Sequence, residues 1–227
     1  MIRRVPRAIL FDFGGTLDSD GVSWKERFYP IYLEEGIDWD LPTFERLFHA
    51  SDDSLSEETL GEVGYQAMLL EQVDRVLRCG NRYDATLARR IADRFYADSL
   101  RCLNRNKPLL EGLSMRYRLG IVSNFYGNLE FLCDEIGYGK FFDVVIDSAR
   151  VGVTKPDAAI FLAALERLDC SPEEVVFVGD NPIRDMAAAK ALGMPHVWLN
   201  TLHPERRACC EEDAIIRSLA ELAQILP

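Results

Sequence analysis

The chain has 227 residues, of which 48% are hydrophobic, and a formal net charge of −11 at pH 7. This length is enough for a full hydrophobic core with an inserted unit, and no apolar run reaches the roughly 18 residues of a membrane-spanning helix. The negative charge would repel nucleic acid and anionic membranes. Composition therefore predicts a soluble, cytoplasmic protein whose partners are neither nucleic acid nor membrane.

Six cysteines are scattered along the chain without the short spacing of a disulfide framework, so we expect reduced thiols. Cys209 and Cys210, with His203 nearby, form the one group that could hold a soft metal. Three such ligands lack the fourth ligand of a closed zinc site. A solvated or half-buried helix start is the simpler interpretation of the cysteine pair.

The first predicted strand, 5–13, leads into a carboxylate and a flexible turn. Its residues are β-branched and aromatic, as in a buried strand, and Asp12 lies near its end. Gly14 and Gly15 allow the backbone to lie close to a ligand, and Thr16 adds a hydroxyl group. Open α/β sheets bind ligands at the carboxyl ends of their strands, so Asp12 is the centre of a candidate site.

About ninety residues without a convincing strand follow, and their apolar residues recur at the three- and four-residue spacing of helices. Helices are predicted at 24–35, 41–50, 56–78 and 83–104. One face of the first helix carries Trp24, Phe28 and Tyr32, which we expect to form part of a helical core. His49 has no acidic partner at a telling spacing and is expected to be structural or exposed.

From residue 107 on, short strands alternate with helices, which indicates a parallel sheet with crossover helices. Strands are predicted at 119–123, 142–146, 175–178 and 196–199, and helices at 128–136, 156–168, 182–192 and 213–225. We predict an α/β fold with a Rossmann-like parallel-sheet core, residues 1–17 plus 107–227, and an inserted α-helical bundle, residues 18–106. Two adjacent connections would let this insertion move as a lid.

Three further polar clusters follow predicted strands, on the edge where Asp12 lies. They are Ser123 with Asn124, Lys155 before a helix, and Asp180 with Asp185. A hydroxyl group, an amide and an ammonium can hold the oxygens of a phosphoryl group, and carboxylates bind a hard divalent cation. Together the clusters predict phosphoryl chemistry around Asp12.

These clusters, in this order, resemble the four motifs of the haloacid dehalogenase superfamily of hydrolases with a helical cap inserted after the first strand. The matching segments are FDFGGTL at 11–17, IVSN at 121–124, TKPD at 154–157 and GDNPIRD at 179–185. Any one of them is common, but four at predicted strand ends are not. The resemblance covers nearly the whole chain.

The resemblance implies a phosphatase that acts through an aspartyl-phosphate. Asp12 would be the nucleophile, Lys155 would neutralise it and the phosphoryl oxygens, and Ser123 would donate a hydrogen bond to the phosphoryl group. Further phosphate-binding donors would come from Gly15, Thr16 and Asn124. The ligands of Mg²⁺ would be Asp12, the backbone carbonyl of Gly14, Asp180 and, through water, Asp185. The implied substrate is a phosphorylated small molecule, and the implied assembly is a monomer or a homodimer.

Gly14 departs from the pattern of the family's phosphatases, which usually carry a second Asp two residues after the nucleophile. That Asp is the general acid and base, a contribution of about 10² to 10⁴ in rate, and glycine cannot replace it. The resemblance thus implies activity that is weak or restricted to good leaving groups, such as acyl or aryl phosphates. It also predicts that Gly14→Asp raises the activity.

Three other functions stay open for this sequence. The first is a binding or regulatory protein with an inactive site. The second is a 2-haloacid dehalogenase, a branch that also lacks that Asp. This branch resembles enzymes that work without a metal and whose fourth motif lacks the Gly-Asp pair, which is present here as Gly179–Asp180. The third is a phosphonoacetaldehyde hydrolase, which uses a cap lysine as a Schiff base; Lys25 is the only lysine in residues 18–106.

Overall fold

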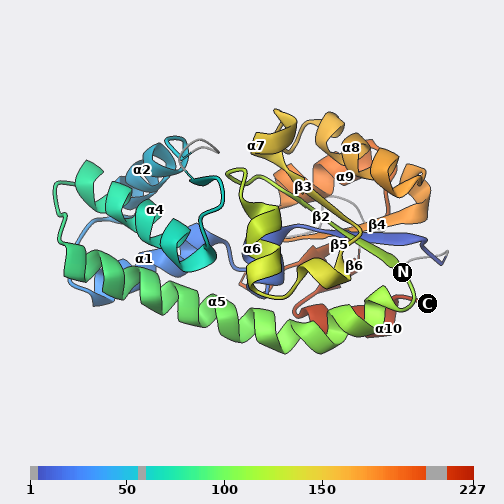
Figure 1. The fold of residues 1–227 in the computed structure, drawn as a ribbon, viewed down its shortest axis with the longest axis horizontal. Coiled ribbons are helices and arrows are strands. Elements are labelled where there is room, and N and C mark those ends of the chain that lie inside the picture. Colours follow the sequence, from blue (N-terminus) through green and yellow to red (C-terminus); the bar gives the residue numbers. More distant parts are fainter. Residues whose placement is uncertain (1–4, 56–59, 203–213) are drawn as a thin grey trace.

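The computed structural model, which describes residues 5–55, 60–202 and 214–227, contains a parallel sheet with a helical insertion (Figure 1). The strands are β1 (Ala8–Phe11), β2 (Arg118–Ser123), β3 (Val144–Asp147), β4 (Val175–Gly179), β5 (His196–Leu199) and β6 (Ala214–Ile216). They form one six-stranded sheet in the order β3-β2-β1-β4-β5-β6, with every pair parallel. The predicted α/β fold is confirmed.

β1 is a central strand of this sheet, between β2 and β4, and its four residues are fully buried. A parallel strand covered on both faces reads as a continuous apolar run, which is why its sequence shows no alternation. Phe11 is in register with Ile121 of β2 and Val178 of β4. The residues that follow these three strands therefore leave the sheet at one edge.

Helices cover both faces of the sheet (Figure 1). One face carries α7 (Ser148–Val151), α8 (Ala158–Leu168) and α9 (Ala188–Ala191), and the other carries α6 (Leu129–Glu135), α10 (Leu222–Ile225) and part of α5 (Ala85–Ser114). Ala8 and Leu10 belong to an apolar core that includes residues of α8, and Ile9 and Phe11 belong to a second core that includes residues of α5 and α6. Side chains of one strand alternate between its two faces, so β1 joins both cores.

The insertion between β1 and β2, called the cap below, contains α1 (Trp24–Glu34), α2 (Leu41–Asp52), α4 (Tyr65–Cys79) and the first part of α5. α1 begins with a capping box formed by Ser23 and Glu26. Phe28 and Tyr32 are buried, and the ring of Phe28 stacks on Phe95 at 3.8 Å between centroids. Residues 56–59, the predicted start of the third helix, lie outside the described residues.

α5 corrects one predicted boundary, because it continues through Pro108 to Ser114 instead of ending at residue 104. Its second half packs under the sheet, where Leu103 and Leu110 are fully buried, so tertiary packing keeps the proline within the helix. Asn106 donates a hydrogen bond from Nδ2 to the carbonyl of Leu17 at 3.0 Å. The two connections to the cap are thus tied together, and the second one is helical.

The end of the chain is the second correction. A helix was predicted at 213–225, but 214–216 form the edge strand β6, followed by a single turn at Leu219–Glu221 and by α10. Two adjacent isoleucines pair there with β5, whose edge would otherwise be open. The possible metal group of His203, Cys209 and Cys210 lies outside the described residues. Within the described part of the chain, no helix combines the length and apolarity needed to cross a membrane.

Candidate active site

Asp12 follows β1 directly, and its carboxylate is held from two sides. Ser123, the last residue of β2, donates from Oγ to Oδ1 of Asp12 at 2.7 Å, and Nζ of Lys155 lies 2.7 Å from the same oxygen. The exposed fractions are 5% for Asp12, 2% for Ser123 and 4% for Lys155. Three residues that are far apart in the sequence therefore form one buried polar group at the edge of the sheet.

Lys155 bridges two carboxylates, since its Nζ also lies 2.7 Å from Oδ1 of Asp185. Burial disfavours the charged form of this lysine, but attraction to Asp12 and Asp185 outweighs it, and the pKa of Lys155 is raised above its ordinary value. The side-chain amide of Asn124 holds the Lys155 backbone, accepting from its N–H at 2.7 Å and donating to its carbonyl at 3.0 Å. Asn124 thus positions the lysine.

Asp12, Asp180 and Asp185 have carboxylate oxygens within 4.8 Å of one another. Burial raises the pKa of Asp180 well above its ordinary value, and the charges of Asp12 and Asp185 raise it further. Three carboxyl groups converge around the ammonium of Lys155, and repulsion between their ionised forms disfavours the fully ionised group. A hard divalent cation with oxygen ligands would stabilise it, and this donor set fits one.

Two glycines allow these carboxylates to lie against the backbone. Gly15 has a φ of +90°, and a Cβ added there would lie 2.6 Å from Oδ2 of Asp180. A Cβ on Gly179 would lie 2.5 Å from Oδ2 of Asp185. Any side chain at either position would push a carboxylate away, so both glycines are required for the cluster.

The turn after β1 also directs polar groups toward protein partners. The N–H of Gly15 donates to Oδ1 of Asp18 at 2.7 Å, and the hydroxyl of Thr16 lies 3.4 Å from Oδ1 of Asp180. Both residues were predicted to bind phosphate directly. In this structure they shape the turn and support a carboxylate, and direct phosphate binding by them stays a prediction.

At Gly14 the neighbouring side chain, and not the backbone conformation, favours a glycine, in contrast to Gly15. Its φ of −75° and ψ of 117° suit any residue. A Cβ added there would lie 3.1 Å from Nε1 of Trp24, closer than side chains normally pack. The indole of Trp24, predicted to belong to the cap core, is partly buried against that core and also lines the space next to Gly14.

Asp18 was not among the predicted site residues, yet it is fully buried and heavily hydrogen-bonded. Its Oδ1 accepts from Gly15, and its Oδ2 accepts from donors on α1, α4 and α5. These donors are Trp24 at 2.8 Å, Arg27 at 2.7 Å, Tyr65 at 3.0 Å and Ser99 at 3.3 Å. Asp18 therefore ties the turn after β1 to three helices of the cap, and no local sequence pattern indicates this.

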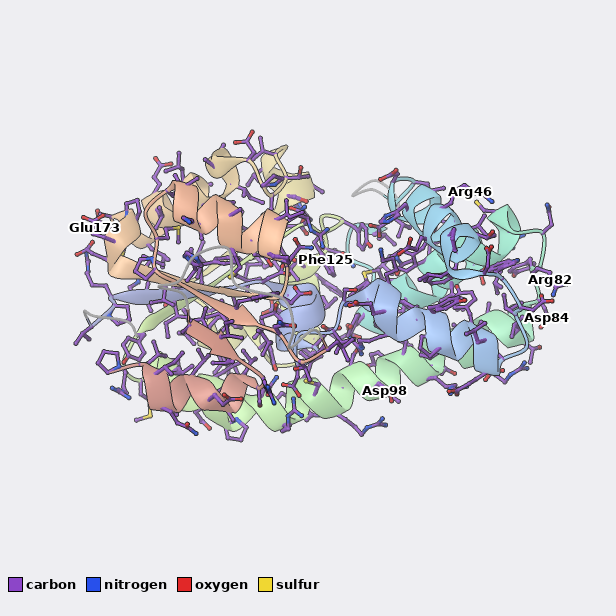
Figure 2. The ribbon with its side chains drawn as sticks, turned by 180° about the vertical axis from the view of Figure 1, so that it is seen from behind. Arg46, Arg82, Asp84, Asp98, Phe125 and Glu173 are labelled. Atoms are coloured by element: carbon purple, nitrogen blue, oxygen red, sulfur yellow. The ribbon has the colours of Figure 1, made fainter. Side chains whose placement is uncertain are left out.

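A cavity of about 290 Å³ lies over Asp12, between the core and the cap. The core contributes Asp12, Ser123 and Lys155 together with Phe125, Tyr126 and Arg184, and the cap contributes Trp24, Lys25, Phe48, His49 and Asp52. Figure 2 labels Phe125 at the junction of the two parts. His49 is exposed, as expected, but it also forms part of the cavity wall. Cap residues with acidic and basic side chains thus face the predicted nucleophile.

Comparison with known sequences connects this site to a family. Residues 6–193 match the sequence model of haloacid dehalogenase-like hydrolase. The chain is 33% identical over 129 residues to glyceraldehyde 3-phosphate phosphatase of Methanothermobacter thermautotrophicus, which covers 54% of this chain and 57% of that protein. It is 31% identical over 121 residues to pyrimidine 5'-nucleotidase YjjG of Escherichia coli, covering 52% and 53%. The matches thus span little more than half of these relatives.

Solved structures share the whole fold. The magnesium-bound HAD-hydrolase YfnB of Bacillus subtilis has 21% identity and a TM-score of 0.64, with 98% of this chain and 99% of that chain covered. A HAD phosphatase from Thermococcus onnurineus has 26% identity and a TM-score of 0.56, with 97% of each chain covered. With a family match over most of its length and the motif residues gathered at one edge of the sheet, the chain belongs to the haloacid dehalogenase-like hydrolases.

Proposed function

We propose that the protein is a Mg²⁺-dependent phosphatase that hydrolyses phosphorylated small molecules through an aspartyl-phosphate on Asp12. The observation that carries this proposal is the contact of Asp12 with Ser123 and Lys155, beside a carboxylate cluster that suits a divalent cation. Phosphatases of small phosphorylated molecules among the relatives support the substrate class.

The reaction has two in-line steps at phosphorus. In the first step the Asp12 carboxylate attacks, the bond to the leaving oxygen breaks, and Ser123 and Lys155 hold the phosphoryl oxygens. In the second step water attacks the same phosphorus, which releases phosphate and restores Asp12. Mg²⁺ held by Asp12, Asp180, Asp185 and the carbonyl of Gly14 would neutralise phosphoryl charge during both steps.

Gly14 determines which substrates react at useful rates. Glycine offers no proton to the leaving oxygen. A site without another proton donor would therefore hydrolyse only acyl and aryl phosphates, or would hydrolyse all phosphates slowly. Any wider range requires a proton donor from another part of the cavity.

The test is hydrolysis of 4-nitrophenyl phosphate with Mg²⁺. We expect Asp12→Asn to lower kcat/KM by about 10³-fold or more, because the nucleophile is lost. Asp38→Asn is a matched control, since this cap carboxylate is 85% exposed and should leave the rate unchanged. Equal rates for the wild type and Asp12→Asn would contradict the proposal and favour a binding or regulatory role.

One observation favours a second candidate, a phosphonoacetaldehyde hydrolase. Lys25 lines the cavity that Asp12 lines, as a Schiff-base lysine must. Its Nζ lies 2.7 Å from Oε1 of Glu45, so the ammonium already has a partner, which weighs against this role. Borohydride trapping of phosphonoacetaldehyde on the wild type, lost in Lys25→Ala, would establish the alternative.

A further inference from the structure

We propose that Asp52 of the cap is the general acid and base of the reaction at Asp12, and that Tyr126 positions it. This inference rests on the proposed phosphatase function and supplies the proton donor that position 14 lacks. Among the described residues that line the cavity, Asp12 and Asp52 are the only two with carboxyl groups. Since Asp12 is the nucleophile, Asp52 is the one carboxyl left to exchange a proton there.

Position 14 is crowded for a side chain in this structure. A Cβ at Gly14 would lie 3.1 Å from Nε1 of the Trp24 indole, which donates to Asp18 at 2.8 Å. Asp18 cannot take the role, because it is fully buried, does not line the cavity and already accepts hydrogen bonds on both oxygens. The proton donor must therefore come from another wall of the cavity.

Asp52 is held against the core beside the predicted phosphoryl-binding residues. It ends α2, and its Oδ1 accepts hydrogen bonds from the hydroxyl of Tyr126 and from Nε2 of Gln72, the latter at 3.2 Å. Tyr126 follows Ser123 by three positions, in the loop after β2. The Tyr126 contact thus fixes a cap carboxyl on the core segment that also carries Ser123.

The surroundings of Asp52 favour a carboxyl that holds its proton. Burial raises its pKa above the ordinary value, and the hydrogen bond from Tyr126 opposes this without cancelling it. Burial raises the pKa of Tyr126 well above its own ordinary value, so the hydroxyl stays a donor. Weaker influences come from the charges of His49 and Arg184, which lower the pKa of Asp52, and of Asp53, which raises it. A carboxyl of raised pKa suits acid and base catalysis near neutral pH.

The proposed proton transfers balance over one turnover. As Asp12 bonds to phosphorus, Asp52 gives its proton to the leaving oxygen, and an alcohol departs. As water then attacks phosphorus, the Asp52 carboxylate takes a proton from that water. Phosphate leaves, Asp12 is restored as a carboxylate, and Asp52 is again protonated.

Asp52→Asn separates the two steps experimentally. The value of kcat/KM reports phosphoryl transfer to Asp12, the first irreversible step, for 4-nitrophenyl phosphate and for a set of alkyl phosphates. We expect Asp52→Asn to lower kcat/KM by about 10²-fold or more for the alkyl esters and by less than about tenfold for the aryl ester, whose leaving group needs no proton. The value of kcat should fall for both, and intact-mass measurement should detect phosphorylated protein, because dephosphorylation has lost its base.

Three further variants test the assignment. Tyr126→Phe removes a hydrogen bond that lowers the pKa of Asp52, so the basic limb of the pH profile for alkyl esters should move to higher pH. Asp38→Asn should change neither substrate class. His49 also lines the cavity, so an alkyl-specific loss in His49→Gln but not in Asp52→Asn would overturn the proposal.

The remaining outcomes distinguish this inference from the function on which it rests. Equal losses for alkyl and aryl esters in Asp52→Asn, or a wild type that hydrolyses only the aryl ester, would overturn the role of Asp52 and leave the phosphatase standing. If Asp12→Asn turns over phosphate esters as fast as the wild type, or if the wild type shows no turnover, both the role of Asp52 and the phosphatase function are overturned.

Discussion

The core wall and the cap wall of the cavity are built in different ways. The core wall carries Asp12 directly after β1, Ser123 at the end of β2 and Lys155 shortly before α8, and the last two each contact Asp12 at 2.7 Å. The cap wall carries Trp24 and Asp52, which come from two helices and are held by residues of other elements. The core wall thus contains the groups that we propose hold a phosphoryl group. The cap wall contains the side chains that would surround the leaving group.

The largest expected effect is on the core wall. Lys155→Met would leave Asp12 and Asp185 without the buried ammonium between them. Breaking such a buried pair costs about 3 to 5 kcal/mol, and we expect loss of activity by about 10³-fold as well. Urea unfolding and kcat/KM for 4-nitrophenyl phosphate measure the two effects, with the exposed Lys140→Met as control. A stable and active Lys155→Met would show that the core wall does not depend on this ammonium.

The next effect concerns the segment between β1 and α1, which links the core to the cap. Two carboxylates of this segment, Asp18 and Asp20, can be compared. Asp18→Ala removes the fully buried partner of Arg27, and we expect a loss of about 2 to 4 kcal/mol in the free energy of unfolding. Asp20→Ala removes a partly exposed partner of Arg105, which should cost at most about 1 kcal/mol. Similar unfolding free energies for the two variants would contradict the role assigned to Asp18.

Gly14→Asp tests whether Trp24 of the cap wall prevents an acid at position 14 from raising the activity. The sequence alone predicts a gain of activity, but the new side chain would meet the Trp24 indole at 3.1 Å. We expect no gain in Gly14→Asp, and a gain of several-fold, about 0.5 to 1 kcal/mol in barrier, when Trp24→Phe is added. Trp24→Phe alone is the control for the lost hydrogen bond to Asp18. A clear gain in Gly14→Asp alone would mean that the indole moves aside freely.

The smallest effect lies on the outer surface of the cap, where Glu35 pairs with Arg90 and Arg94 at 2.8 and 3.0 Å. Hydrogen bonds from Arg90 and Arg94 lower the pKa of Glu35 below 4.5 despite some desolvation. Its stabilisation is therefore present above pH 4.5 and is lost as the pH falls through the lowered pKa. Glu35→Gln should have a free energy of unfolding lower than that of the wild type by at most about 1 kcal/mol at pH 7. Chemical unfolding should show that this difference becomes smaller below about pH 4. A difference that is constant with pH would exclude this ion pair as its cause.

The sequence predicted the core wall of the cavity better than the cap wall, because residues that follow neighbouring parallel strands come together at one edge of the sheet. The polar residues after β1, β2 and β4 had to come together once the sheet was parallel, and Asp12, Ser123 and Asp180 lie at that edge. The end of α5 and the strand β6 were missed. Packing under the sheet outweighs the proline in α5, and pairing with β5 outweighs the helical pattern of 214–216.

The sequence by itself determined the α/β fold, the helical insertion and the residue types of the candidate site, because motif order and apolar periodicity are local properties of the chain. Only the tertiary structure decided that Gly14 lies against Trp24, that Asp18 accepts hydrogen bonds from three cap helices, and that Asp52 lines the cavity of Asp12. These contacts join residues across two connections and several helices. Their geometry depends on how the cap packs on the core, which no spacing in the sequence encodes.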